Sequence, residues 1–315
     1  MRRAQLIELH EQPWFPLSLR HEITDALQFG LNLLQAYAPI APLLQSSLDS
    51  TQCRSIVDMC SGGGGPWLDL SRRLQPDARV FRILLTDKCP NLGAFQNVRV
   101  ASDNHIAFCS NSVDATKVPG DLPGYRTMFT SFHHFPPEEA RAILQNAVDA
   151  GQSIGVFEIT RRAPSAIALM FPWALMLFAF TPLIRPFRWS RLLYTYLIPI
   201  IPLVLLFDGV VSCLRTYRPP ELREIIKKLS GIEYRWEVGE HSTASGQAPI
   251  TYLIGTPQPR VPTTGPRRRR DPDCRCKGRH PAWEGSPSKT ISSRDASSSR
   301  RCKRAPANDR PCAAS

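Results

Sequence analysis

The sequence predicts an α/β protein with a doubly wound, mostly parallel, seven-stranded sheet, and three observations support that fold class. Short apolar runs alternate with helix-like stretches between residues 55 and 159. Four consecutive glycines, residues 62–65, follow the first apolar run directly. Two further β-like runs, residues 234–238 and 250–255, come later in the chain. Alternating strands and helices give a parallel sheet covered on both faces, and the last two runs can close it as an antiparallel pair.

The first element is a predicted amphipathic helix within residues 21–46. Apolar side chains recur there at spacings of three or four, at Ile23, Leu27, Leu31, Leu34 and Ala38. That spacing places them on one face of a helix. We therefore expect residues 1–50 to form a helical lid ahead of the sheet.

The sheet region follows in steps of strand and helix. Strands are expected at residues 55–59, 80–86, 106–109, 128–132 and 153–159. Helices are expected from Pro66 to Leu74, over residues 137–150 and, after an interruption, over residues 219–229. Ligands of open parallel sheets bind beyond the carboxyl ends of the strands, so residues in those loops should converge on one site.

The glycine turn after the first strand is the main candidate for a ligand site. Glycines permit positive φ and close approach of the backbone to a ligand, and Pro66 suits the first position of a helix. The Gly-x-Gly-x-x-Gly pattern of dinucleotide sites is not matched, because Trp67 stands in place of the third glycine. Asp58, just before the turn, suits a ligand with a cationic amine better than one with a pyrophosphate.

Two more acids follow the next two predicted strands. Asp87 ends the second, where a carboxylate can accept hydrogen bonds from ribose hydroxyls. Asp114 follows the third, where an adenine amino group could be recognised. An aspartate near a turn often only bonds local backbone, which is the alternative for each acid alone. Three acids after three successive strands favour a site for a nucleotide-like cofactor.

This pattern resembles the class I S-adenosylmethionine-dependent methyltransferases over residues 50–256. Residues 58–64 resemble the first motif of that family, Asp87 its ribose-binding acid and Asp114 its adenine-side acid. Cys60 replaces the usual first glycine, as the ubiquinone and menaquinone methyltransferases tolerate. The resemblance implies a Rossmann-like methyltransferase fold and an enzyme with S-adenosylmethionine as its cofactor. The implied cofactor-binding residues are Asp58, Cys60, Gly62, Gly64, Asp87, Asp114 and Ala115.

His133 and His134 are the predicted catalytic residues. They resemble the paired histidines after the fourth strand of quinone-type and other small-molecule methyltransferases. Histidine titrates near neutral pH and could take a proton from an acceptor hydroxyl. The alternative is that both side chains only shape the floor of the pocket.

An apolar insertion, residues 163–211, interrupts the sheet region. Residues 163–184 and 192–207 carry no charge, and Arg185, Arg188 and Arg191 lie between them. Each run is near the roughly 20 residues that a membrane-spanning helix needs. Prolines interrupt both runs, and a spanning hairpin would export three arginines against the positive-inside rule. A hairpin in one leaflet is therefore favoured over two spans, with a soluble apolar lid or a dimer interface as the alternative.

Charge is concentrated after residue 256. Residues 257–315 hold 15 Lys and Arg against 5 Asp and Glu, so they carry +10 of the formal +12. This Pro-, Ser- and Arg-rich tail lacks apolar periodicity, and we expect it to be disordered. The remaining chain is nearly neutral, which makes a nucleic-acid partner unlikely. Cys274 and Cys276 are too close together for a zinc-knuckle pattern, and no metal site is predicted.

The predicted function is transfer of a methyl group to a lipophilic small molecule or lipid at a membrane surface. An apolar insertion beside the acceptor pocket of this fold suits such an acceptor. The catalytic domain comprises residues 51–162 and 212–256. Scattered cysteines and the absence of an apolar leader predict a cytoplasmic, membrane-associated protein. An RNA methyltransferase that uses the basic tail and a catalytically silent membrane scaffold are the competing interpretations.

Overall fold

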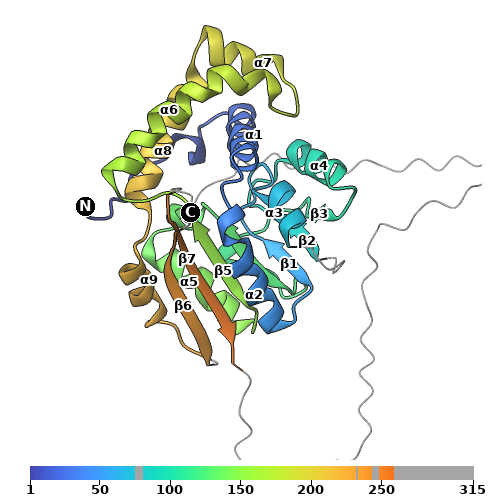
Figure 1. Ribbon diagram of the computed structural model, residues 1–315, viewed down its shortest axis with the longest axis vertical. Coiled ribbons are helices and arrows are strands. Elements are labelled where there is room, and N and C mark those ends of the chain that lie inside the picture. The colour runs from blue at the N-terminus through green and yellow to red at the C-terminus, as the bar shows by residue number, and fades with distance from the viewer. Residues whose placement is uncertain (75–80, 232, 243–247, 259–315) are drawn as a thin grey trace, which may run out of the picture. The chain divides into compact units, whose positions relative to one another are not determined.

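A seven-stranded sheet with strand order β3-β2-β1-β4-β5-β7-β6 forms the centre of the fold (Figure 1). The computed structural model describes residues 1–74, 81–231, 233–242 and 248–258. The strands are β1 (Ser55–Asp58), β2 (Arg82–Leu85), β3 (Ile106–Phe108), β4 (Tyr125–Phe129), β5 (Ile154–Glu158), β6 (Tyr234–His241) and β7 (Ile250–Pro257). Strands β1 to β5 pair in parallel, and β7 is antiparallel to both β5 and β6. The predicted doubly wound, mostly parallel sheet is confirmed.

Helices cover both faces of the sheet. On one face lie α2 (Ala41–Thr51), α3 (Trp67–Arg73) and α4 (Leu92–Ala101), which share one buried apolar cluster with β1, β2 and β4. On the other face α5 (Pro137–Asp149) and α9 (Pro219–Ile226) pack in a second cluster. Met128 and Phe129 are consecutive in β4 and belong to different clusters, as alternation along a strand requires.

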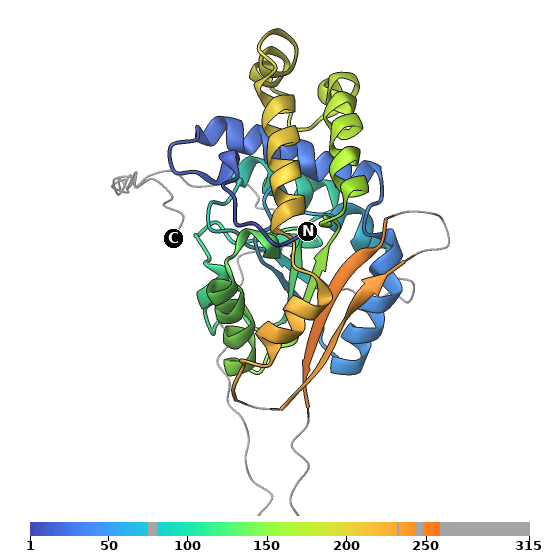
Figure 2. The same ribbon diagram turned by 90° about the vertical axis from the view of Figure 1, so that its left-hand side faces the viewer.

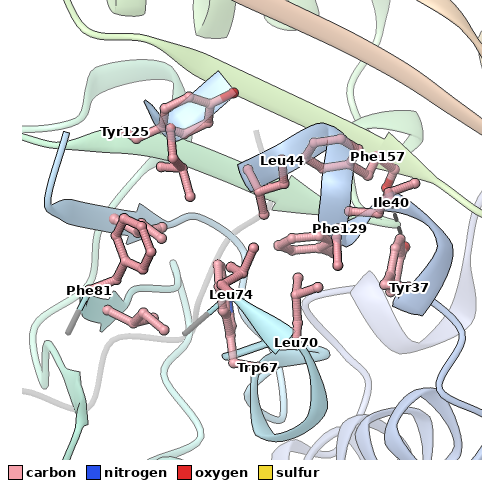
Figure 3. Close-up of a cluster of buried hydrophobic side chains, with 14 of the residues drawn as sticks. Tyr37, Ile40, Leu44, Trp67, Leu70, Leu74, Phe81, Tyr125, Phe129 and Phe157 are labelled. Atoms are coloured by element: carbon pink, nitrogen blue, oxygen red, sulfur yellow. Dashed lines mark hydrogen bonds between the residues drawn. The ribbon is translucent and has the colours of Figure 1, made fainter. Parts of the chain in front are cut away.

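An aromatic group holds α3 against the sheet (Figure 3). Phe129 of β4 lies edge to face with Trp67 at 5.4 Å and with Tyr37 at 4.8 Å, measured between ring centroids. Phe157 of β5 stacks on the same ring at 5.4 Å. These preferred ring geometries stabilise the cluster beyond area burial alone. Because Trp67 begins α3, the cluster also fixes the carboxyl end of the glycine turn.

The N-terminal region departs from its prediction. Two helices replace the single helix expected within residues 21–46, namely α1 (Leu17–Leu33) and α2, with the short 3₁₀ helix η2 (Ala38–Ile40) before α2. Gln35 has φ +49°, which ends a right-handed helix, and Pro39 lacks the N–H that a continuing helix would use. The apolar face of residues 21–46 is therefore divided between two helices.

The fourth strand begins three residues before its predicted position. Its prediction at residues 128–132 was wrong because Arg126 makes residues 125–127 look unlike a buried strand. In the structure the Arg126 side chain is buried, and its Nη1 donates to Asn146 Oδ1 at 2.7 Å. One hydrogen-bonded guanidinium thus lies in a fully buried strand. Helix α4 was not predicted at all.

The insertion forms a helical unit above α1 (Figure 1). It contains α6 (Pro164–Phe180), the 3₁₀ helix η5 (Thr181–Leu183), α7 (Trp189–Leu192), a π-helical turn (Leu193–Leu197) and α8 (Ile200–Arg215). Helices α6 and α8 lie side by side (Figure 2), and both share a buried apolar cluster with α1. Helix α6 continues through Pro172 without ending, unlike the interruption that prolines predict.

One segment of the insertion, Pro164–Leu183, is long and apolar enough to cross a membrane, with a mean hydropathy of 1.9, and little of it is buried. The segments Trp189–Leu197 and Ile200–Arg215 reach that length only together, and a bend of 76° separates them.

Two of the three insertion arginines face α1 instead of solvent. Arg191 is 1% exposed and forms an ion pair with Asp25 Oδ2, and Arg188 Nε lies 3.6 Å from the same oxygen. Ser190 donates a hydrogen bond to Glu22 of α1. The segment between α6 and α8 is therefore attached to α1 by one buried ion pair and two partly exposed polar contacts.

Candidate active site

A cavity of about 1100 Å³ lies beyond the carboxyl ends of the parallel strands, with α1, α6 and α8 around it. Eight of the nine predicted site residues line it: Asp58, Cys60, Gly62, Asp87, Asp114, Ala115, His133 and His134. The exception is Gly64, where an added Cβ would lie 2.6 Å from Val98 Cγ2 of α4. This glycine therefore allows close packing of the turn on α4.

The glycine turn has the positive φ angles that its glycines permit. Gly62, Gly64 and Gly65 all have positive φ, at +55°, +109° and +57°. Cys60 also has positive φ, at +56°, although it carries a side chain. A glycine at that position would relieve the strain, since L-residues with a Cβ rarely adopt this conformation. Helix α1 lies directly on the turn, because a Cβ at Gly63 would be 2.4 Å from the Thr24 carbonyl oxygen.

Asp58 is buried behind the turn and is hydrogen-bonded by the protein itself. Its Oδ2 accepts from Ser61 Oγ and its Oδ1 from Thr127 Oγ1, each at 2.7 Å. Burial raises the pKa of Asp58 to about 7, although these hydrogen bonds act in the opposite direction. Both oxygens thus hold the turn to β4, while contact of Asp58 with a cofactor amine stays a prediction.

Asp87 links the second strand to the glycine turn. Its Oδ2 accepts from the Gly62 N–H and its Oδ1 from the Cys89 N–H, both at 2.8 Å. Burial raises the pKa of Asp87, and the two N–H donors partly offset that effect. A carboxylate offers about four acceptor positions, so each oxygen can accept one more hydrogen bond.

Asp114 begins the 3₁₀ helix η3 (Ala115–Lys117) at the next strand end. Its Oδ1 accepts from the Thr116 N–H at 2.8 Å and from Thr116 Oγ1 at 2.6 Å. The acid is therefore a local turn-former, which the sequence left open, and it also lines the cavity. Its neighbour Ala115 is buried against the α5 cluster.

His133 and His134 form the 3₁₀ helix η4 (Phe132–His134) after β4, with ring centroids 4.2 Å apart. His133 is buried, and its Nδ1 lies 2.7 Å from Glu158 Oε2 at the end of β5. His134 Nδ1 lies 2.6 Å from Glu11 Oε1 and 3.2 Å from Glu8 Oε2. The catalytic role of both histidines remains a prediction, since these distances describe their protein partners only.

Carboxylates control the ionisation of His134. Burial disfavours the imidazolium, but Glu11 and Glu8 outweigh it and raise the pKa of His134 well above its ordinary value. For Glu8 the effect of burial is likewise exceeded by the histidines, which lower its pKa to about 2. The group of Glu8, Glu11, His133, His134 and Glu158 is called the His–Glu cluster below. This cluster brings ionisable carboxyl and imidazole groups together beside the cavity.

Residues that were not predicted complete this cluster. Glu8 and Glu11 come from the N-terminal segment that includes the 3₁₀ helix η1 (Leu9–Glu11). Helix α8 holds that segment, because Asp208 accepts hydrogen bonds from the Leu9 and His10 N–H groups at 2.7 and 3.1 Å. Arg215 of α8 pairs with Glu11 Oε2 at 2.8 Å. The insertion therefore positions acids that lie about 200 residues earlier in the sequence.

Two signals in the sequence could have identified part of this network. Glu158 is the single charge in the buried strand β5, and Asp208 is the single acid in α8. A carboxylate in an apolar element is rarely buried unless it is paired. Glu8 and Glu11 offer no such signal, because they lie in an irregular segment.

The part of the cavity under the insertion is apolar. Its walls include Leu27 and Leu31 of α1, Met170 and Trp173 of α6, and Leu205 of α8. Trp173 lies directly on Gly30 of α1, where an ideal Cβ would be 1.8 Å from the indole ring. The insertion thus forms a wall of the cavity as well as an external helical unit.

No protein-family model and no curated protein matches the chain. Among solved structures, the plantazolicin methyltransferase BpumL in complex with SAH aligns with a TM-score of 0.50 at 8% identity, over 80% of this chain and 95% of that chain. An O-methyltransferase family protein from Burkholderia thailandensis aligns at 0.44 and 16% identity, over 74% of this chain and 59% of that chain. PigF with SAH aligns at 0.43 and 16% identity, over 81% of this chain and 62% of that chain.

This chain thus spans about 60% of the length of the last two structures. BpumL and the Burkholderia thailandensis protein are described as methyltransferases, and the BpumL and PigF structures contain SAH. The strand order with its antiparallel β7, together with the likeness to BpumL, shows that this chain has the Rossmann-like fold of the class I S-adenosylmethionine-dependent methyltransferases.

Proposed function

We propose that this protein is an S-adenosylmethionine-dependent methyltransferase that modifies a lipophilic small molecule or lipid at a membrane surface. The observation that carries the proposal is one cavity with two chemically different parts. One part holds the glycine turn, Asp87 and Asp114, and the other is the apolar chamber under α6 and α8. Its volume of about 1100 Å³ exceeds the ~300–1,000 Å³ of pockets that take one small ligand.

The residues around the turn fit S-adenosylmethionine. Asp87 keeps acceptor capacity on both oxygens, which suits two ribose hydroxyls. Ser131 Oγ and His21 Nε2 are buried at the cavity wall without a hydrogen-bond partner among the described residues. Such atoms indicate polar ligand contacts. Bound there, S-adenosylmethionine would supply a methyl group on a positively charged sulfur.

The chain's own residues would align the acceptor, exclude water and take its proton. Helices α1, α6 and α8 enclose the apolar chamber, so an acceptor there would be oriented away from bulk solvent. Glu8, Glu11, His133 and His134 of the His–Glu cluster line the same cavity and would offer proton-accepting groups to an acceptor hydroxyl bound there. The apolar walls favour an acceptor with a hydrophobic body and one polar reacting group.

Exposed apolar side chains support a membrane partner. Of the 22 large hydrophobic residues that are exposed in the described chain, 13 lie between Leu169 and Phe207. Trp189 and Leu197 are 77% and 75% exposed. Concentrated exposure of this kind marks an interaction surface, and an interfacial helix buries such side chains among lipid headgroups.

The arginine contacts favour contact with one leaflet over a spanning hairpin. Arg188 and Arg191 face Asp25 of α1, and a span would break these contacts and carry the arginines through the bilayer. Each arginine at the bilayer centre costs about 2.5–3.5 kcal/mol. We propose that the insertion rests on the cytoplasmic leaflet with α1 still attached.

Binding and turnover test the enzymatic proposal separately. Calorimetry on the full chain should show binding of S-adenosylmethionine, and labelled methyl groups should appear in the lipid fraction of a cell extract. Because Cys60 resembles the quinone-type enzymes, hydroquinones are the first defined acceptors to try. Tight NAD binding without S-adenosylmethionine binding would overturn the proposal. Cofactor binding without transfer to any acceptor would instead favour the silent scaffold.

Vesicle sedimentation tests the membrane surface. Replacing Trp189, Leu197 and Leu203 together by serine should abolish sedimentation of the protein with phospholipid vesicles. The matched control replaces Leu92 and Val100, two exposed apolar residues of α4, by serine and should leave binding unchanged. Equal binding by both variants and the original protein would contradict the proposed surface.

A further inference from the structure

Three side chains of the His–Glu cluster converge on one point at the cavity wall. The nitrogens and oxygens that Glu8, His133 and His134 can offer to a metal ion all lie within 4.8 Å of one another. His133 Nε2 lies 3.6 Å from Glu8 Oε1, and His134 Nδ1 lies 3.2 Å from Glu8 Oε2. All three residues line the cavity.

The orientation of His133 is fixed from behind. Its Nδ1 lies 2.7 Å from Glu158 Oε2, so Nε2 points toward Glu8. Glu158 is itself held, because its Oε1 accepts from the Phe132 and His133 N–H groups at 2.7 and 3.2 Å. A carboxylate bonded to the far nitrogen of a histidine is the usual support of a metal-binding imidazole.

Three potential ligand atoms have no hydrogen-bond partner among the described residues: His133 Nε2, Glu8 Oε2 and His134 Nδ1. The side chains of His133 and Glu8 are 1% and 0% exposed, and that of His134 is 20% exposed. A buried polar atom without a partner is costly, and native structures rarely contain one unexplained. A cation between the three side chains would satisfy all three atoms.

The charges around this point also favour a cation. Arg215 Nη1 lies 3.4 Å from Glu8 Oε1 and 2.8 Å from Glu11 Oε2, while Asp208 and Glu158 are paired with His10 and His133. These four carboxylates outnumber the one guanidinium in these ion pairs, so the group has a negative excess whenever its histidines are neutral. A divalent ion balances it without requiring any histidine to be charged.

We propose that Glu8, His133 and His134 bind a divalent metal ion of the zinc type, with an open position toward the cavity. Two imidazoles and one carboxylate form a ligand set of catalytic zinc sites, in which water or substrate takes the fourth position. Ligands at ~2.0–2.1 Å around a tetrahedral ion lie roughly 3.3 Å apart, close to the two distances measured here. A role in the reaction rests on the proposed function: the open position of the metal ion would receive the acceptor oxygen and favour its deprotonated form.

Metal binding can be measured without cofactor or turnover. The full chain, stripped with a chelator, should bind one Co²⁺ with the visible absorption of a tetrahedral site, and Zn²⁺ should displace it. Glu8→Gln and His133→Gln should each abolish that absorption, while the exposed-residue control His105→Gln should retain it. Glu158→Gln should weaken binding about 10- to 100-fold, because it loosens the His133 ring.

X-ray absorption of the original protein loaded with Zn²⁺ provides a test that requires no variant to fold. Two imidazole nitrogens and oxygen at about 2.0–2.1 Å are expected, whereas cysteine ligands would give sulfur at about 2.3 Å. Sulfur ligands alone, no bound metal, or an unchanged Co²⁺ spectrum in Glu8→Gln would overturn the metal site. A metal-loaded protein that transfers no methyl group would count against the proposed function only.

Discussion

Replacing Asp58 by asparagine should remove a large part of the pH dependence of stability in the cofactor-free protein. Burial raises the pKa of this carboxyl to about 7 from an ordinary value of 3.8, and nearby Asp87 adds to the effect. Hydrogen bonds from Ser61 and Thr127 offset only part of it. Asparagine has the same shape and carries no charge, so the turn can keep its position.

The sign follows from where the proton binds more tightly. Between pH 3.8 and about 7 the folded chain keeps the proton of Asp58 while the unfolded chain has released it. The contribution of Asp58 to the free energy of unfolding is therefore fully present below pH 3.8 and is lost as the pH rises toward 7. Each pH unit corresponds to about 1.4 kcal/mol, so the loss from pH 5 to pH 8 is about 3 kcal/mol.

Urea denaturation at pH 5, 6, 7 and 8 measures this effect at constant ionic strength. Relative to that of Asp58→Asn, the free energy of unfolding of the original protein should fall by about 3 kcal/mol between pH 5 and pH 8. The same replacement at the exposed Asp121 should show no such trend. Parallel curves for the original protein and Asp58→Asn would refute the reasoning, since they would mean that Asp58 ionises alike in folded and unfolded chains.

Three further predictions concern the cofactor site and the insertion. Asp87→Ala should lower the affinity for S-adenosylmethionine at least about tenfold in calorimetry, because hydrogen bonds to a charged group contribute about 1.5–3 kcal/mol; an unchanged affinity would exclude Asp87 from the site. Asp25→Ala should lower the free energy of unfolding by about 3–5 kcal/mol, because it leaves Arg191 buried without its carboxylate, and adding Arg191→Met should recover much of the loss in urea denaturation. Gly30→Ala should destabilise the protein by about 1–3 kcal/mol in the same assay, because its Cβ would overlap Trp173, and the second replacement Trp173→Leu should relieve it.

The sheet was predictable because its signals are local. Strands β1, β3 and β5 lie within their predicted ranges, since a strand buried on both faces is a short apolar run. Strand β4 was misplaced because one buried arginine, Arg126, has a partner in α5 that no local pattern reveals. The break between α1 and α2 combines Pro39, which the sequence shows, with a positive φ at Gln35, which its residue type does not predict.

The convergence of the three acids on one cavity was predictable for a topological reason. Asp58, Asp87 and Asp114 follow three parallel strands, and such ends lie along one edge of a sheet. The His–Glu cluster was only half predictable, because Glu8 and Glu11 reach His134 through contacts with distant parts of the chain.

Contacts between distant parts of the chain were also unpredictable for the insertion. Its apolar runs were evident, and its arginines were expected to avoid the membrane interior. Their partner Asp25 lies 166 residues before Arg191, so the sequence pattern alone could not identify it. A charge in an apolar segment therefore signals a partner without saying where that partner is.

The attachment of the N-terminal segment to α8 has a consequence for the order of events during synthesis. Glu8 is made early, yet its hydrogen-bond donor Ser212 follows 204 residues later. Closing a loop of that length costs about 2.5 kcal/mol more than closing one of about 12 residues, so the contact should form late in folding. A chain still on the ribosome would hold the glycine turn and its acids long before the His–Glu cluster is assembled. The nascent protein should therefore gain the proposed cofactor site first and the complete His–Glu cluster only after α8 has emerged.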